Sequence, residues 1–200
     1  MLKKILNIKA ATPFLLRSNG FLCFVLSLLC SSQVLASDIS YEEDVIAAAK
    51  SGDPQSQFAL ALLYEHGAAI VDRDPSKAIE WFEKAGRKKV EGACLYLGLK
   101  YEYGNRVKKD LKKAACWYEC AARKDWPAAQ FFLASMYEKG KGVRRSSFDA
   151  LVWFGLAAEY GYPGAQAEFD RITSDTSFKD MDRLRRKQER LLRLDPPSCN

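Results

Sequence analysis

Histidine is nearly absent from this chain, since His66 is its single copy among 200 residues. Metal sites built on two histidines, such as the helical zinc motifs, are therefore excluded. The sequence also lacks the S-x-x-K, G-x-S-x-G and P-loop patterns, so it offers no familiar nucleophile or phosphate cradle. We expect His66 to lie exposed at a helix end, and we expect no enzymatic activity, no bound metal and no cofactor.

Long apolar runs are lacking near the N-terminus. The run Phe21–Cys30 is well short of the roughly 20 residues that a membrane-spanning helix needs. It follows a basic leader and is followed by small residues ending at Ala36, a pattern that predicts a secretory signal over residues 1–36, cleaved after Ala36. The alternatives are an uncleaved membrane anchor and a lipoprotein acylated at Cys30, which the bulky Leu29 disfavours. The cations of the leader are Lys3, Lys4, Lys9 and Arg17.

A strong excess of positive charge is also lacking once the leader is removed. The whole chain carries a net charge of +6, but residues 37–200 hold 27 Lys and Arg against 25 Asp and Glu, a net charge of +2. This balance gives no reason to expect nucleic-acid binding, which usually requires a basic face. We expect a periplasmic or secreted protein with no transmembrane anchor after cleavage, whose partner is another protein or a peptide segment.

What the chain does contain is a repeated pattern. Tyr64, Tyr101 and Tyr137 begin the same motif, Y-E-x-G, at steps of 37 and 36 residues. Self-similarity at a period of 20 to 50 residues is typical of stacked-repeat proteins. Other positions recur at steps of 36: Ala78, Ala114 and Ala150; Trp81, Trp117 and Trp153; Phe82, Tyr118 and Phe154; and Ala85, Ala121 and Ala157.

The recurring residues are spaced i, i+3, i+4 and i+7, which predicts an apolar stripe on a helix. We predict an all-α fold, an α/α solenoid of helical hairpins with a capping helix at each end. Three repeats are expected at residues 54–90, 91–126 and 127–161, with Trp117 buried in the middle one. Residues 37–53 should form the N-terminal cap, beginning with a capping box at Ser40 and Glu43.

Residues 162–200 should hold a partial repeat, a loop at residues 173–177, a basic amphipathic helix over residues 178–194 and a tail. We interpret this helix as the polar cap that a stack of repeats requires; the alternative is a helix that lies on a membrane surface.

The repeats resemble the Sel1-like repeat family, whose unit reads L-G-x-x-Y-x-x-G-x-G-V-x-x-D-x-x-K-A-x-x-W-Y-x-K-A-A. The first and third repeats match less fully, and Ser146 stands where aspartate is usual. The resemblance covers roughly residues 45–170 and implies an adaptor that holds proteins together. The matching residues of the middle repeat are Leu97, Gly98, Tyr101, Gly104, Val107, Asp110, Lys113, Ala114, Trp117, Tyr118, Ala121 and Ala122.

Secreted members of this family resemble signalling regulators, host-interaction factors and accessory proteins of envelope machines such as the flagellar motor, and a cysteine-rich subgroup has been linked to β-lactam compounds. These imply two alternatives to a scaffold: a β-lactam-binding or β-lactam-hydrolysing protein, and an accessory component of an envelope machine. The subgroup pairs cysteines at positions that correspond to Gly86 and Cys94, and Gly86 has no thiol.

Four cysteines follow the leader: Cys94, Cys116, Cys120 and Cys199. Cys94 and Cys120 each lie 13 residues from Val107, the centre of a hairpin turn, so they should stand at the same height on antiparallel helices. We expect a Cys94–Cys120 disulfide, which leaves Cys116 and Cys199 for each other or for a partner protein. Cys116 and Cys120 also lie one helical turn apart, but without further ligands nearby they make only a weak metal signal.

The first helices of the hairpins should line the usual groove for a partner segment. Phe58 and Phe131 are expected to pack between repeats instead. An acidic residue recurs at the helix ends as Glu65, Glu102 and Glu138; it either attracts a partner with basic flanks or pairs with Lys112, Lys113 and their equivalents. The candidate binding residues are Tyr96, Leu99, Tyr103, Phe132, Glu102 and Glu138.

We predict that a non-reduced digest of the mature protein contains a peptide pair linked through Cys94 and Cys120, because the hairpin brings their Cα atoms within bridging distance. Mass spectrometry before and after reduction identifies the pair. A Cys116–Cys199 link found together with free Cys94 and Cys120 would contradict this expectation.

Overall fold

The computed structural model describes residues 39–175, 181–195 and 197–199. The chain divides into two units, Met1–Tyr41 and Glu42–Asn200. Within the first unit, residues 39–41 are described and are helical, and the expected signal at residues 1–36 lies outside the described residues. All the repeats lie in the second unit.

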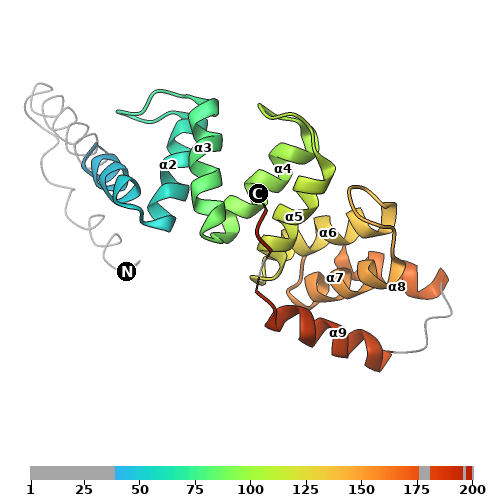
Figure 1. Ribbon diagram of the computed structural model, residues 1–200. Helices are drawn as coiled ribbons and strands as arrows, with labels where there is room; N and C mark the ends of the chain where they lie inside the picture. The colour runs from blue at the N-terminus through green and yellow to red at the C-terminus, as the bar shows by residue number, and fades with distance from the viewer. Residues whose placement is uncertain (1–38, 176–180, 196, 200) are drawn as a thin grey trace, which may run out of the picture. The chain divides into compact units, whose positions relative to one another are not determined.

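Helical hairpins build the second unit (Figure 1). The two helices of each repeat pack against each other, and the second helix of one repeat packs against the first helix of the next. The described residues contain no strand, so the predicted all-α class is confirmed. The helices of the three repeats are α2 (Pro54–His66) and α3 (Pro75–Arg87), α4 (Glu91–Tyr103) and α5 (Leu111–Ala122), and α6 (Pro127–Lys139) and α7 (Ser147–Glu159).

A polar side chain caps the second helix of every repeat. The carboxylate of Asp74 accepts hydrogen bonds of 3.1 Å from the backbone N–H groups of Ser76 and Lys77. Asp110 caps α5 in the same way, and the Ser146 hydroxyl accepts a hydrogen bond from the Asp149 N–H at 3.1 Å. These caps satisfy N–H groups that have no partner within the helix, so serine at position 146 keeps the function of the usual aspartate.

One backbone hydrogen bond recurs across the turn of each hairpin. The N–H of the capping residue donates to the carbonyl oxygen of the tyrosine that begins the Y-E-x-G motif. This bond holds the end of the first helix beside the start of the second. The first loop is one residue longer than the other two, and the extra residue lies between these two bonded residues. The pairs are Asp74 with Tyr64 (2.8 Å), Asp110 with Tyr101 (2.9 Å) and Ser146 with Tyr137 (2.9 Å).

The recurring aromatic residues form the core of the stack. Trp117 and Trp153 are buried, whereas the equivalent Trp81 is half-buried. Trp81 packs at the N-terminal end of the stack, where the single helix that includes residues 42–51 contributes the buried Val45 and Ala49. The end repeat therefore covers its tryptophan less completely than the repeats that have a neighbour on both sides.

Small residues let the two helices of a hairpin approach closely. Gly98 of α4 is buried against the ring of Tyr118. A Cβ atom built on Gly98 would lie 2.5 Å from the ring carbons of Tyr118, which is closer than real Cβ contacts. Ala61 and Ala134 occupy the equivalent positions in the other repeats and are also fully buried.

The C-terminal part continues the stack with α8 (Ala165–Asp175) on α7 and then returns α9 (Met181–Arg193) onto α7. The face of α9 that packs inward holds Leu184, which is buried, and Gln188, which is half-buried. The side-chain amide of Gln188 donates a hydrogen bond of 3.2 Å to the Val152 carbonyl oxygen. α9 is thus a basic helix that covers α7, as the interpretation of it as a cap requires.

Two details of the predicted ends are wrong. Residues 39 and 40 are already helical, so Ser40 does not begin its helix. The nearby Glu42 instead contacts the turn of the first hairpin, where its carboxylate accepts hydrogen bonds from the N–H groups of Ala69 and Ile70. Residues 173–175, which were expected in a loop, belong to α8, and the rest of the expected loop lies outside the described residues. Across the described residues, we find no helix with the length and apolar character to cross a bilayer.

We predict that Trp117→Ala lowers the free energy of unfolding by about 3–5 kcal/mol, because it leaves a cavity in the core. Trp117 is 4% exposed, whereas Trp126 is 38% exposed. Trp126→Ala is therefore the matched control and should cost much less. Urea unfolding followed by circular dichroism measures both, and equal losses for the two variants would contradict the burial of Trp117.

Candidate partner-binding surface

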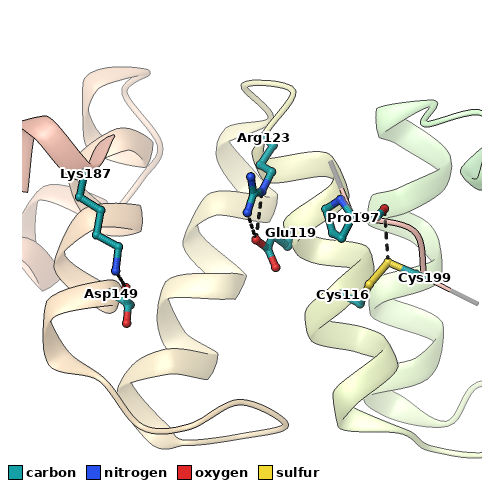
Figure 2. Close-up of polar contacts among 7 residues, drawn as sticks. All are labelled: Cys116, Glu119, Arg123, Asp149, Lys187, Pro197 and Cys199. Carbon is teal, nitrogen blue, oxygen red and sulfur yellow. Dashed lines mark hydrogen bonds and ion pairs between the residues drawn. A yellow bond between two sulfur atoms is a disulfide. The ribbon is translucent and has the colours of Figure 1, made fainter. Parts of the chain in front are cut away.

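The middle repeat carries three of the four cysteines that the structure joins. Cys94 of α4 and Cys120 of α5 form a disulfide with Cα atoms 5.9 Å apart, and both residues are fully buried. Cys116 of α5 forms a second disulfide with Cys199 in the C-terminal tail, with Cα atoms 5.7 Å apart (Figure 2). The middle hairpin is thereby joined internally and to the end of the chain.

Gly86 cannot hold a cysteine without rearrangement. A Cβ atom at this position would lie 2.9 Å from side-chain carbons of both Leu97 and Trp117. The pairing of positions 86 and 94 that is implied by the cysteine-rich subgroup is therefore sterically blocked as well as chemically absent, and Cys94 is bonded to Cys120 instead.

Tyr96 and Phe132 occupy equivalent positions on α4 and α6 and pack between repeats. The ring of Tyr96 stacks on Phe82 of the preceding repeat with centroids 5.1 Å apart. The ring of Phe132 lies 5.4 Å from that of Tyr118, again in the preceding repeat. Both side chains are half-buried, so each presents only part of its ring to a partner. Phe131 was expected to pack between repeats; its ring lies 5.3 Å from Phe154 of the same repeat and 4.9 Å from Tyr162, which directly follows that repeat.

Tyr103 is the most exposed of the candidate residues. It is the last residue of α4 and is 70% exposed. Gly104 follows it in the left-handed conformation that often ends a helix. Leu99 lies one turn earlier on the same side of α4 and is half-buried against the core, so Tyr96, Leu99 and Tyr103 form one stripe along the helix.

The recurring glutamates have partners inside the protein. Glu65 forms an ion pair with Lys100 of the next repeat, and Lys100 is 6% exposed. Glu138 forms an ion pair with Arg171 of α8. Glu102 instead accepts a hydrogen bond of 2.6 Å from the Tyr118 hydroxyl. The alternative in which these glutamates pair with Lys112, Lys113 and their equivalents is therefore wrong, because their side chains bind Lys100, Arg171 and the Tyr118 hydroxyl instead.

Sequence reasoning did not identify Lys100 and Arg171 as the cations that pair with these glutamates. The signal was present, since Lys100 follows Glu65 by 35 residues, close to one repeat. A buried lysine is stable only when its charge is paired. The equivalent position in the third repeat is Met136, which is buried, so the ion pair distinguishes the junction of the first two repeats from the next one.

Two buried tyrosines have perturbed hydroxyl groups. Burial raises the pKa of Tyr101 to about 12, and its hydrogen bond to Glu83 adds to the shift. Burial also raises the pKa of Tyr118, and the hydrogen bond to Glu102 acts in the same direction. Both effects keep the hydroxyl neutral, because a phenolate would be desolvated and would face a carboxylate.

The described residues around this surface form no metal-binding cluster. His66 is exposed at the last residue of α2, as predicted. Among the residues that the structure describes, no group of three His, Cys, Asp or Glu side chains could hold a metal ion. The candidate partner-binding surface consists of the stripe on α4 together with Phe132 on α6.

Comparison with known proteins identifies the repeats. A family model of the Sel1 repeat matches residues 54–90, 92–126 and 127–162. Among solved structures, the chain is similar to a Sel1 repeat protein from Oxalobacter formigenes, with 33% identity and a TM-score of 0.62, covering 64% of this chain and 96% of that one.

A protective antigen of uropathogenic Escherichia coli strains, which displays an SLR fold, is also similar in structure. It has 24% identity and a TM-score of 0.55, and the match covers 80% of this chain and 42% of that one. This second likeness shows the fold alone. No curated protein matches the chain.

We predict that alkaline pH destabilises the protein through Tyr118. A hydroxyl whose pKa is raised by folding stabilises the folded state below the unfolded pKa of about 10, and the contribution is lost as the pH rises above that value. Above pH 10, the free energy of unfolding of Tyr118→Phe should fall with pH less steeply than that of the wild type, by about 1.4 kcal/mol per pH unit.

Urea unfolding between pH 8 and pH 11.5 measures this slope. Tyr103→Phe, which removes an exposed hydroxyl, is the matched control and should keep the wild-type slope. The burial of Tyr118 would be contradicted if both variants showed the same slope as the wild type.

Proposed function

Because the chain belongs to the Sel1 repeat family, we propose that it is a periplasmic or secreted scaffold that binds a partner protein through the exposed side of α4 and α6. Members of this family are generally protein-interaction scaffolds and are typically non-catalytic. The observation that carries the proposal is the exposed ring of Tyr103 at the end of the stripe on α4.

An exposed aromatic ring that lies next to half-buried apolar side chains is typical of a hot spot in a protein–protein interface. Tyrosine supplies a large contact area and a hydroxyl with few rotatable bonds, and hot spots are enriched in it. Leu99 and Tyr96 continue the apolar stripe beside Tyr103, while Phe132 repeats the Tyr96 position on α6. The glutamates are engaged within the stack, so the proposed contact depends on the aromatic and aliphatic side chains.

The disulfides support the proposed location. Disulfides persist mainly in oxidising compartments, and all four cysteines after residue 36 are bonded in the structure. The composition of residues 1–36 agrees with export by a cleavable signal.

We predict that Tyr103→Glu abolishes partner binding without unfolding the protein. Purified mature protein is used to capture proteins from a periplasmic or culture-medium extract, and the recovered proteins are quantified by mass spectrometry. Tyr160→Glu is the matched control, since Tyr160 is 51% exposed but follows α7, a second helix.

At least one protein should be recovered with the wild type and with Tyr160→Glu, and about tenfold less with Tyr103→Glu. Identical capture by the two variants would overturn the proposed surface. Tyr96→Glu is a poor probe, because a charge there would disturb the stack on Phe82.

A further inference from the structure

A basic groove lies between α7 and α9. Its volume is about 650 Å³, and it opens between the first turn of α7 and the side of α9. Four cations and a single carboxylate line it. That carboxylate, Asp149, is paired with Lys187 (Figure 2), so the remaining charge of the lining is positive.

Two of these cations have no partner among the side chains that the structure describes. Arg186 and Arg190 line the groove and are exposed. They lie one turn apart on α9, which separates them by about 6 Å along the helix axis. Carboxylates at alternate residues of an extended peptide are spaced by about 6.7 Å, so such a segment can place one carboxylate near each arginine.

The groove also has an apolar side. Phe148 and Leu191 line it, and Leu194 is 44% exposed at its end. A neighbouring hollow shares Ser146 and Asp149 with the groove and adds Arg144 and Arg145. The positive lining therefore continues along the loop that precedes α7, far enough for a segment of several residues.

We propose that this groove binds an acidic segment of a partner protein, with carboxylates at alternate positions and apolar side chains between them. Arg186 and Arg190 would bind the carboxylates, and the apolar residues between them, which point to the other side of an extended segment, would contact Phe148 on α7. Charge complementarity supplies the specificity and the rate of association. This surface is made by other helices than the α4–α6 surface, so the two proposals can fail separately.

An anionic membrane surface fits the groove less well. A helix that binds a bilayer buries its apolar face among the lipids. Part of the apolar face of α9 is already used, since Leu184 is buried and the neighbouring Gln188 amide donates a hydrogen bond to the Val152 carbonyl oxygen. The Cys116–Cys199 disulfide also joins the segment after α9 to α5, which opposes release of the helix toward a membrane.

The test is a titration of the mature protein into a fluorescent ten-residue peptide of alternating glutamate and leucine, followed by anisotropy at low and at physiological salt. The protein should bind this peptide, and more weakly at higher salt. The double variant Arg186→Glu with Arg190→Glu should lose about tenfold or more in affinity, because like charges then face each other. The neutral variant Arg186→Gln with Arg190→Gln should lose less, and it remains informative if the charge reversal impairs folding.

The matched control is the double variant Arg185→Glu with Arg193→Glu. It changes the net charge equally, but neither residue lines the groove, and Arg185 is exposed and pairs with Glu189. This variant should bind nearly as the wild type does.

Four outcomes would overturn the proposal. They are no binding of the peptide, equal losses in the groove and control variants, binding of phosphatidylglycerol vesicles in place of the peptide, and a concentration-dependent dimer that the groove variant abolishes. The first two leave no specific site, the third assigns the site to a membrane and the fourth to a second copy of the chain.

Discussion

The apolar stripes of the repeated helices cannot be buried within a single hairpin, and every other feature of the structure depends on this constraint. Stacking solves it, because the second helix of each repeat covers the first helix of the next. The degree of burial follows the number of neighbours. Trp117 and Trp153 lie inside the stack and are buried, whereas Trp81 near the N-terminal end remains half-buried.

Stacking also decides which charged side chains form ion pairs within the protein. The recurring glutamates end the first helices, where the next repeat supplies Lys100 to one and Arg171 to another. A glutamate that forms an ion pair across a junction fixes the register of two repeats and is less available to a partner. The surface that remains for recognition on this side is mainly aromatic and aliphatic, with Tyr103 at its most exposed point.

The C-terminal segment changes the surface of α7, the second helix of the last repeat. α9 covers the apolar surface of α7 with Leu184 and directs its arginines away from that contact. Its position is held by the Lys187–Asp149 pair and by the disulfide between Cys116 and Cys199 (Figure 2). A helix that closes the stack thus also forms one wall of a basic groove, which gives the chain a second surface of different chemistry.

The class of fold and the positions of the repeats could be predicted from the sequence, because the spacing of the apolar residues and the turn residues recur at a nearly fixed period. The helices at residues 54–66 and 91–103 and the buried Trp117 follow from that period alone. The orientation of the Tyr96 ring, the cation that pairs with Glu65 and the packing of α9 depend on contacts between helices, which join residues 14, 35 and 38 positions apart. These contacts could be read only from the folded chain, because the rotation of one helix against the next sets whether a side chain faces the core, the neighbouring repeat or solvent.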